Sequence, residues 1–442
     1  MVTNVILVLT GMAGLWLIAA GLLQGRNPTW WWYLAGYPVT VVRMLWTWKR
    51  LCVQVGLTGD RRGARVVLGG MAVQGQTLKP IIPVLRPGRP VRDGLTARVR
   101  LLPGQVPLEY AKQSEAITHA WRVHSVRVSS PRRGWVEIRA YSIDPLAGVV
   151  ERDPDAPVPK DEPPHPGMSL ALVVGVREDA RAWVIDLRLV PHWMIVGATR
   201  SGKSTLLHAV VAALAALRVA LVGIDLKGGL ELGLYGPRLS GLAISRAEAA
   251  ELLDAVLSLA FARMEDCRAA GAQSVWQLPD VPPPVVVIVD EVAELYLQTG
   301  SSEEKRLRER CASALLRLAQ LGAALGVYLL VCGQRIGSDL GTGVTALRAQ
   351  LGGRICHRVN DEETAVMALG DVFPEAVASA LLLTPTEQGV AVTTDGVGGW
   401  VRARSAWTTP REAAETAVRF AARTPVLAGI ARPQVVGGGE TR

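Results

Sequence analysis

At 442 residues the chain is long enough for two or three domains. Its net charge of +9 and isoelectric point of about 9.6 favour an acidic partner such as nucleic acid or anionic lipid. The five cysteines are scattered without a C-x-x-C pair, and the six histidines lie at no metal-binding spacing, so the sequence argues against a disulfide framework and against a protein-built metal site.

The first 57 residues are predicted to be a membrane anchor of one or two helices. Residues 5–23 are apolar and uncharged, and a helix of that length spans about 28 Å, close to the hydrocarbon thickness of a bilayer. The aromatic cluster at residues 30–33 is typical of the headgroup level. The next run, residues 34–48, is interrupted by glycine, proline and arginine, and it fits either a second span or a helix in the membrane plane. The basic residues that follow predict that the rest of the chain is cytoplasmic.

Residues 58–150 are predicted to form a small α/β domain. We expect strands at 65–68, 95–100, 123–128 and 135–141, and a helix at 108–121. Residues 61–144 carry 15 lysines and arginines against 5 acids, which accounts for the whole positive excess of the chain. A solvated basic face and a binding surface for DNA or anionic lipid both fit this excess. A Pro- and Asp-rich stretch at 151–167 predicts a linker.

Residues 168–423 alternate strand-like and helix-like runs, which predicts an α/β domain with a mostly parallel sheet buried on both faces. The expected helices include 247–268, 303–321 and a last one at 411–423. The Gly- and Pro-rich tail, 424–442, is expected to be loose. The expected strands are 193–196, 219–224, 285–289, 327–331, 354–359 and 389–392.

A phosphate-loop pattern, Gly-x4-Gly-Lys-Ser, lies between the expected strand at 193–196 and a helical pattern that follows it. The two glycines allow successive N–H groups to surround a phosphate, and the helix N-terminus adds its positive dipole end. Lys203 is predicted to reach the β- and γ-phosphates of ATP, and Ser204 to bind Mg²⁺. The predicted nucleotide-binding residues of the loop are Gly197, Ala198, Thr199, Arg200, Ser201, Gly202, Lys203, Ser204 and Thr205.

Polar residues at the ends of later strands complete the predicted site. The apolar strand 285–289 ends in Asp290, predicted to hold Mg²⁺ with Ser204, and in Glu291, predicted to activate the attacking water as a general base. Gln334 follows the next strand and is predicted to sense the γ-phosphate. Asp225 ends the strand 219–224 and fits either the edge of the nucleotide site or an N-cap or turn role.

From residue 95 to residue 407 the chain resembles the FtsK/SpoIIIE family of DNA-pumping ATPases. The segment 108–141 is similar to the small domain that precedes the motor in that family. The resemblance implies a RecA-like P-loop motor, ATP and Mg²⁺ as cofactors, double-stranded DNA as substrate and a homo-hexameric ring. An arginine of the neighbouring subunit would complete the site, with Arg317, Arg348 and Arg354 as candidates. The resemblance rests on the phosphate loop together with Pro191-His192, Ile224–Lys227, Asp290-Glu291, Arg317–Gln320, Gly333–Arg335 and residues 349–359.

The layout is similar to the short membrane-anchored forms of actinobacterial conjugative plasmids and integrated elements, which implies transfer of duplex DNA between cells. We recognise no winged-helix module after the last strand, as expected for a motor that runs along any sequence. Lys305, Arg306 and Arg308 fit a DNA grip and equally fit a solvated helix face. The rival function is protein export by a type VII secretion-like ATPase, although such proteins usually carry several ATPase modules and this chain has one phosphate loop. A passive DNA-binding tether conflicts with Glu291.

Overall fold

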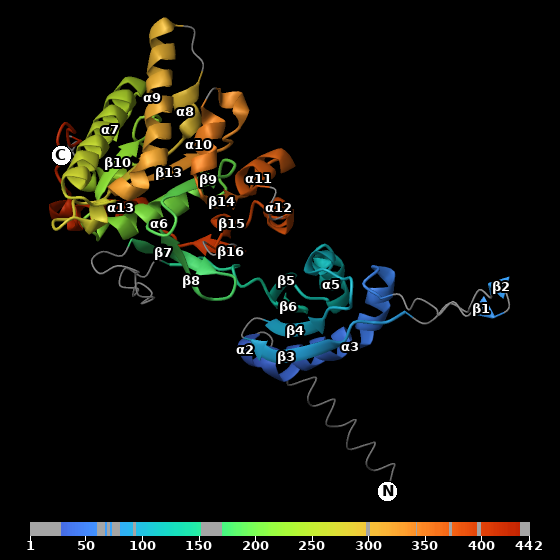
Figure 1. Ribbon diagram of the computed structural model, residues 1–442. Coiled ribbons are helices and arrows are strands. Elements are labelled where there is room, and N and C mark those ends of the chain that lie inside the picture. The colour runs from blue at the N-terminus through green and yellow to red at the C-terminus, as the bar shows by residue number, and fades with distance from the viewer. Residues whose placement is uncertain are drawn as a thin grey trace. The chain divides into compact units, whose positions relative to one another are not determined.

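The structure is a computed structural model that describes residues 28–59, 67–68, 71–72, 80–91, 94–151, 170–297, 301–341, 343–370, 374–395 and 399–433 (Figure 1). The chain divides into two compact units, Met1–Pro145 and Leu146–Arg442, and each is described by itself. The predicted span at residues 5–23 lies outside the described residues, as does most of the predicted linker. Among the helices that are described, none combines the length and the apolar character needed to cross a membrane.

The first unit is a four-stranded antiparallel sheet, in the order β3-β4-β6-β5, with helices on one face. Side chains alternate along β4, where Leu95, Ala97 and Val99 are buried and the residues between them face the other side. The predicted helix at 108–121 is two helices, α4 and α5. The strands are β1 Val67–Leu68, β2 Met71–Ala72, β3 Leu85–Val91, β4 Gly94–Arg100, β5 Ser125–Arg132 and β6 Trp135–Tyr141, and the helices are α2 Pro28–Trp31, the π-helical turn Trp32–Gly36, α3 Tyr37–Gln54, α4 Pro107–Ala111 and α5 Ser114–Trp121.

Helix α3 belongs to the core of this first unit. Met44, Trp48 and Cys52 are buried with the apolar face of the sheet, and the rings of Trp48 and Trp121 lie 6.2 Å apart. The indole N–H of Trp48 donates a 2.8 Å hydrogen bond to the carbonyl of Pro83. The predicted boundary at residue 57 therefore does not separate this helix from the small domain, because one apolar face of α3 completes the domain's core.

The second unit is built on a ten-stranded sheet in the order β11-β10-β12-β13-β9-β14-β15-β16-β7-β8. The first six strands run parallel and the last four pair antiparallel, which confirms the predicted α/β fold with a mostly parallel sheet. The six expected strands correspond to β9, β10 and β12 to β15, whereas β7, β8, β11 and β16 were not expected. The strands are β7 Ala171–Arg177, β8 Ala182–Asp186, β9 His192–Val196, β10 Ala220–Ile224, β11 Gly241–Ala243, β12 Val285–Val289, β13 Val327–Gly333, β14 Gly353–His357, β15 Val390–Thr394 and β16 Trp400–Ser405.

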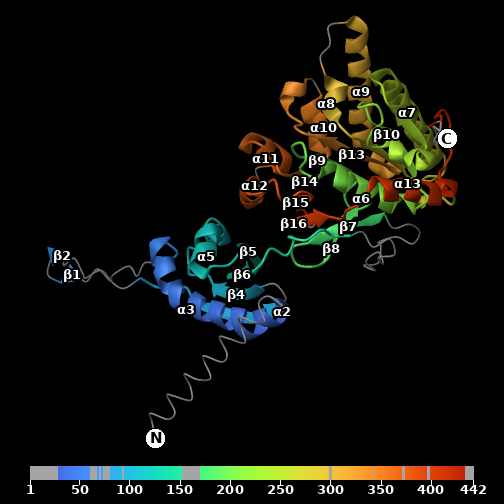
Figure 2. The same ribbon diagram turned by 180° about the vertical axis from the view of Figure 1, so that it is seen from behind.

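Helices cover both faces of this sheet, which is why the central strands are buried along their whole length (Figures 1 and 2). One face carries α7 Arg246–Ala269, α8 Val292–Tyr296, α9 Ser302–Leu321, α10 Val344–Gln350, α11 Glu362–Leu369 and α12 Pro374–Leu381, and the other carries α6 Lys203–Ala215 and α13 Pro410–Arg419. Short 3₁₀ helices lie at Gly233–Arg238, Val275–Gln277, Gly322–Leu325, Ser338–Leu340 and Ala421–Arg423.

Residues 424–433, expected to belong to a loose tail, instead pack on the core of the second unit. Leu427 and Ile430 are buried with the core on the α7 face, and the Ser240 hydroxyl donates a 2.9 Å bond to the Pro425 carbonyl. Gly241 makes room for this contact, because a Cβ there would lie 2.7 Å from the Ile430 side chain. Two apolar side chains thus fix a segment whose glycines and prolines suggested a free end.

Candidate nucleotide-binding site

The predicted phosphate loop connects β9 to α6, and close packing requires both of its glycines. Gly202 has a φ of 107°, and a Cβ on it would overlap the backbone nitrogen of Gly389. A Cβ on Gly197 would collide with the Ser201 hydroxyl. The loop is also tied to the sheet, because the Gly389 N–H donates a 3.0 Å bond to the carbonyl of Ser201. The backbone is therefore held in one shape before any ligand binds.

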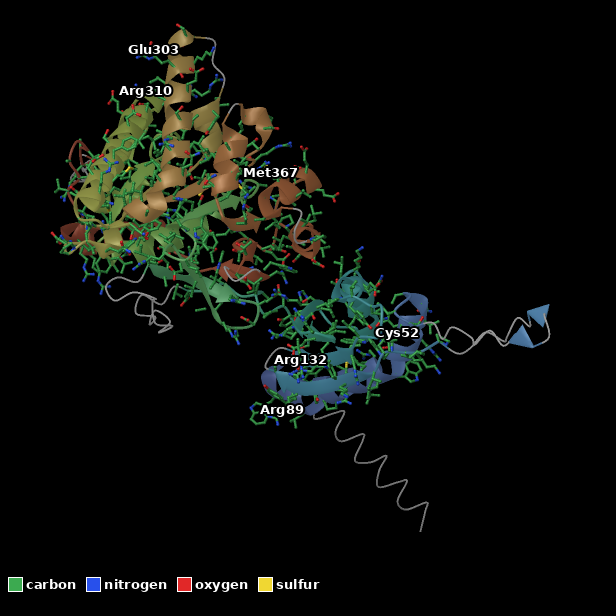
Figure 3. All side chains as sticks on the ribbon, in the orientation of Figure 1. Cys52, Arg89, Arg132, Glu303, Arg310 and Met367 are labelled. Carbon is green, nitrogen blue, oxygen red and sulfur yellow. The ribbon has the colours of Figure 1, made fainter. Side chains whose placement is uncertain are left out.

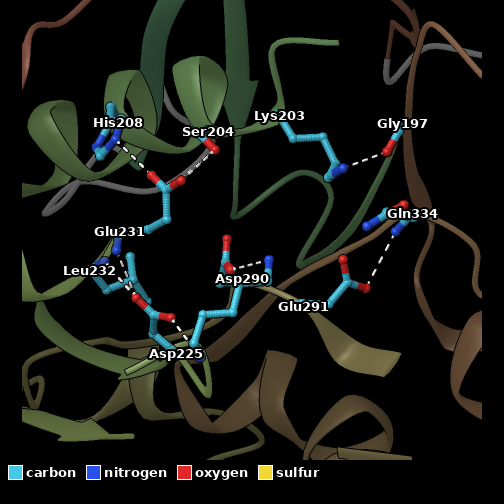
Figure 4. Close-up of polar contacts among 11 residues, drawn as sticks. Gly197, Lys203, Ser204, His208, Asp225, Glu231, Leu232, Asp290, Glu291 and Gln334 are labelled. Atoms are coloured by element: carbon cyan, nitrogen blue, oxygen red, sulfur yellow. Dashed lines mark hydrogen bonds and ion pairs between the residues drawn. The ribbon is translucent and has the colours of Figure 1, made fainter. Parts of the chain in front are cut away.

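Helix α6 begins at Lys203, so the N–H groups of residues 203–205 have no partner within the helix. These groups and the dipole of α6 make the loop a site for an anion. The Lys203 ammonium group lies against the carbonyl oxygen of Gly197, at the mouth of the loop (Figure 4). Burial lowers the pKa of Lys203, and the nearby charge of Glu291 opposes that shift.

Asp290 and Glu291 follow β12, and β13 lies between β12 and the phosphate-loop strand β9. Both carboxylates are nearly buried, with 6% and 7% of their surface exposed. Burial raises the pKa of Glu291, although Lys203 and Lys227 favour its charged form. The Gln334 N–H donates to Glu291 Oε1 at 3.3 Å, while Glu291 Oε2 is buried and has no hydrogen-bond partner within the described part of the chain. Glu291 thus offers one oxygen to a ligand.

The loop that follows β10 contacts both predicted magnesium ligands. The Lys227 ammonium lies 2.9 Å from Asp290 Oδ2, and the Ser204 hydroxyl donates a 3.0 Å bond to Glu231 Oε1 (Figure 4). The imidazole of His208 lies 3.2 Å from the other oxygen of Glu231. Lys227, Glu231 and His208 belong to this site but were not among the residues predicted from the sequence. The sequence signal that could have revealed Lys227 is its position two residues after Asp225, the aspartate that follows β10.

Asp225 shapes this loop. Its carboxylate is fully buried and accepts the N–H groups of Lys227 at 3.2 Å, Glu231 at 2.9 Å and Leu232 at 3.0 Å. The sequence left two kinds of role open for Asp225. These hydrogen bonds show that its carboxylate holds the turn after β10. The Asp225 carboxylate binds backbone N–H groups of its own loop, and this holds Lys227 and Glu231 against the two predicted magnesium ligands.

The three candidate arginines lie in different environments. Arg354 donates to the Arg348 carbonyl at 2.9 Å, and burial lowers its pKa. Arg348 in turn donates to the Ile336 carbonyl at 3.1 Å. Arg317 is exposed on α9, where it bonds Gln320. Of the three, Arg317 has the guanidinium most available to a neighbouring subunit.

The residues that the structure brings together fit a magnesium nucleotide. The loop and the start of α6 offer N–H donors, and Lys203 offers a cation at the position expected for phosphates. The Ser204 hydroxyl and the Asp290 carboxylate are the hard oxygen ligands that Mg²⁺ prefers. The Ser201 hydroxyl and Glu291 Oε2 are buried without a partner in the described residues, so each has capacity for a ligand.

Comparison with known protein families identifies both units. Residues 20–142 match the actinomycete conjugal transfer protein N-terminal domain, a match that runs across the predicted boundary at residue 57. Residues 165–278 and 269–338 match the FtsK/SpoIIIE family. The chain is 43% identical over 360 residues to the transfer protein TraSA of Streptomyces ambofaciens, covering 78% of this chain and 83% of that protein.

More distant proteins share the motor fold. The chain is 29% identical over 220 residues to the DNA translocase FtsK of Bacillus cereus, a match that spans 45% of this chain and 26% of that much longer protein. The solved structure of the pCW3 conjugation coupling protein TcpA, in a monomer form with ATPγS, superposes with a TM-score of 0.54. That likeness covers 83% of this chain and 98% of the other at 18% identity, so it concerns the fold alone.

Proposed function

This chain belongs to the FtsK/SpoIIIE family, in the form of the actinomycete conjugal transfer proteins, and we propose that it hydrolyses ATP to move double-stranded DNA during conjugal transfer. The observation that carries the proposal is the meeting of Lys203, Asp290 and Glu291 at the carboxyl ends of the parallel strands β9 and β12, which β13 separates. Those residue types in that place are what ATP hydrolysis requires.

Each residue has a defined task in this mechanism. Lys203 and the N–H groups at the start of α6 hold the β- and γ-phosphates. Ser204 and Asp290 would hold Mg²⁺, which would neutralise charge on the phosphates. Glu291 uses its unpartnered oxygen to accept a proton from the attacking water, and its hydrogen bond to the Gln334 backbone fixes the carboxylate in place. Arg317 of a neighbouring subunit stabilises the charge that develops on the transferred phosphoryl, in a homo-hexameric ring.

Loading this site would bring a dication close to the Lys227 ammonium. Lys227 is a cation on Asp290, where Mg²⁺ would bind, whereas the Ser204 hydroxyl donates its hydrogen to Glu231 and keeps its oxygen lone pairs for Mg²⁺. The ammonium and the dication would repel each other at one carboxylate, so Lys227 should move, while the Ser204–Glu231 hydrogen bond can remain. We therefore expect nucleotide binding to be coupled to a movement of Lys227, whose loop Asp225 ties to the end of β10.

Lys227→Met should destabilise the nucleotide-free protein by about 1–3 kcal/mol, because Asp290 is left buried without its cation. With saturating Mg²⁺ and a non-hydrolysable ATP analogue the loss should shrink, since Mg²⁺ then pairs with Asp290. Thermal unfolding of both forms measures the difference, with Lys305→Met on the exposed start of α9 as the matched control. An equal loss in the two states would mean that Lys227 stays on Asp290 and that the loop does not move.

The start of α9 is the candidate DNA grip of the motor. This helix projects beyond the body of its unit, and Glu303 lies at its far end (Figure 3). Lys305 and Arg306 are exposed there, and the ion pair of Arg246 with Glu304 offsets one of the neighbouring acids. Positive side chains on a projecting element suit a phosphate backbone, and a motor that must run along any sequence gains nothing from contacts with base edges.

Duplexes of unrelated sequence should all raise the steady-state ATP turnover of the detergent-solubilised chain. Their apparent affinity should fall with salt at a log–log slope of about −0.9 per phosphate neutralised. Stimulation by a secreted-protein peptide, with none by any duplex, would favour the type VII secretion-like function instead. Stimulation by one sequence alone would reveal a base-reading segment that the sequence analysis missed.

Membrane attachment is proposed for the N-terminal region. The uncharged apolar run at 5–23 is long enough to span a bilayer. The outer side of α3 adds a second apolar surface, because Val42, Leu45 and Trp46 are 52–70% exposed on the side of the helix away from the core. No acid occurs before Asp60, and Lys49 and Arg50 lie near the end of α3. Since the opposite side of α3 is committed to the domain core, we place this helix in the plane of the membrane surface rather than across it.

A further inference from the structure

The face of the small domain's sheet that carries none of the described helices is rich in arginine. Because Leu95, Ala97 and Val99 of β4 point into the core, Arg98 and Arg100 point to the open face. Strand register places further residues on the same side. Arg86 lies opposite Arg98, Arg139 lies opposite Arg127, and Trp135 lies opposite Arg100.

This arrangement leaves the open face strongly positive. The strands β3 to β6 contain one acid, Glu137, and two arginines share it, Arg98 at 3.4 Å and Arg139 at 3.2 Å. Like charges placed directly opposite each other on adjacent strands destabilise a sheet, so the Arg86–Arg98 pair costs stability in the isolated chain. A bound polyanion would remove that repulsion.

The side chains of this open face favour phosphate groups over a lipid surface. Arginine binds phosphate oxygens in a bidentate manner. The centre of the Trp135 ring lies 5.9 Å from the Arg86 guanidinium, in a cation–π contact. The exposed aliphatic and tryptophan side chains that suit a lipid surface are on the outer side of α3, and α3 packs on the opposite face of the same sheet. A bilayer against α3 therefore leaves the arginine face turned away from the lipid.

We infer that this arginine face, formed by Arg86, Arg98, Arg100, Arg127 and Arg139, binds the phosphate backbone of duplex DNA outside the motor. It differs from the proposed grip on α9 because it belongs to the first unit, whereas α9 and the phosphate loop belong to the second. The inference rests on the proposed DNA-translocating function. A contact of this kind would retain the duplex while the motor releases and rebinds it between ATP turnovers.

The test compares two double variants of the full, detergent-solubilised chain that lose the same charge. Arg86→Gln/Arg98→Gln changes the arginine face, and Lys112→Gln/Arg122→Gln changes exposed residues that follow α4 and α5. Duplex binding without nucleotide is followed by fluorescence anisotropy across a salt series. Two lost phosphate contacts should make the salt slope shallower by about 1.8, so that the loss of affinity between 50 and 200 mM salt becomes about tenfold smaller. Turnover without DNA should not change.

Each outcome separates this inference from the proposed function. A parental chain that neither binds duplex nor is stimulated by it would contradict the function itself. If duplex stimulates the parental chain and Arg86→Gln/Arg98→Gln keeps the parental salt slope, the arginine face is not a DNA surface. Weaker binding of that variant to anionic vesicles, with an unchanged slope on DNA, would assign the face to lipid and overturn the inference.

Discussion

Glu291→Gln should bind ATP as the parental chain does but hydrolyse it about 10²–10⁴-fold more slowly, because a positioned general base usually contributes a factor of that size. The substitution keeps the shape of the side chain, and its amide oxygen can still accept the Gln334 N–H, but the basic oxygen is lost. Single-turnover phosphate release measures the chemical step, and a fluorescent ATP analogue measures binding. Glu294→Gln, the same change within α8, is the matched control and should hydrolyse ATP at the parental rate.

The pH profile gives an independent check on Glu291. Burial raises the pKa of Glu291, and a base must be deprotonated to act. The rate of ATP turnover should therefore be highest above that raised pKa and should fall as the pH decreases through it. The acid limb of the profile should then lie above the ordinary pH range in which an exposed glutamate titrates.

If Glu291→Gln hydrolysed ATP at the parental rate, Glu291 would not be the general base and another group would have to activate the water.

Removing the Lys203 ammonium should weaken nucleotide binding by at least tenfold. A hydrogen bond to a charged group contributes about 1.5–3 kcal/mol, and here the partners are phosphates in a partly dehydrated loop. Titration of Lys203→Ala with the fluorescent analogue in the presence of Mg²⁺ gives the affinity directly. Arg218→Ala, an exposed cation just after α6, controls for the change in net charge. An unchanged affinity in Lys203→Ala would place the phosphates elsewhere in the chain.

The parts of the site that the sequence could predict are those encoded in short contiguous patterns. The spacing of Gly197, Gly202 and Lys203, and an apolar strand that ends in Asp290 and Glu291, each specify local geometry. The parallel order of strands then brings these separate patterns to one edge of the sheet. The contacts of Lys227 with Asp290 and of Glu231 with Ser204 depend on how a loop folds back over that edge. No periodicity or spacing encodes such a contact.

Other differences between the predicted and the observed structure each have their own physical cause. Helix α3 is apolar on two sides, so its sequence resembles a membrane segment, although Met44 and Trp48 fill a protein core. The strand β16 lies in the antiparallel part of the sheet, and its mixed polar sequence lacks the continuous apolar run that marked the central parallel strands. Burial of Leu427 and Ile430 is a long-range contact of an irregular segment, which composition alone assigned to a free end.

The pairing of β7 with β16 has a consequence for how the protein is made. Arg177, in the first strand of the second unit, pairs with Ala403 near the end of the chain. During synthesis the hairpin of β7 and β8 therefore leaves the ribosome long before its neighbour in the sheet exists. Its free edge exposes backbone N–H and C=O groups that another nascent chain could pair with. Folding of this unit is completed from its C-terminal end, and a chain that stops before Trp400 would present an unpaired sheet edge and be prone to aggregate.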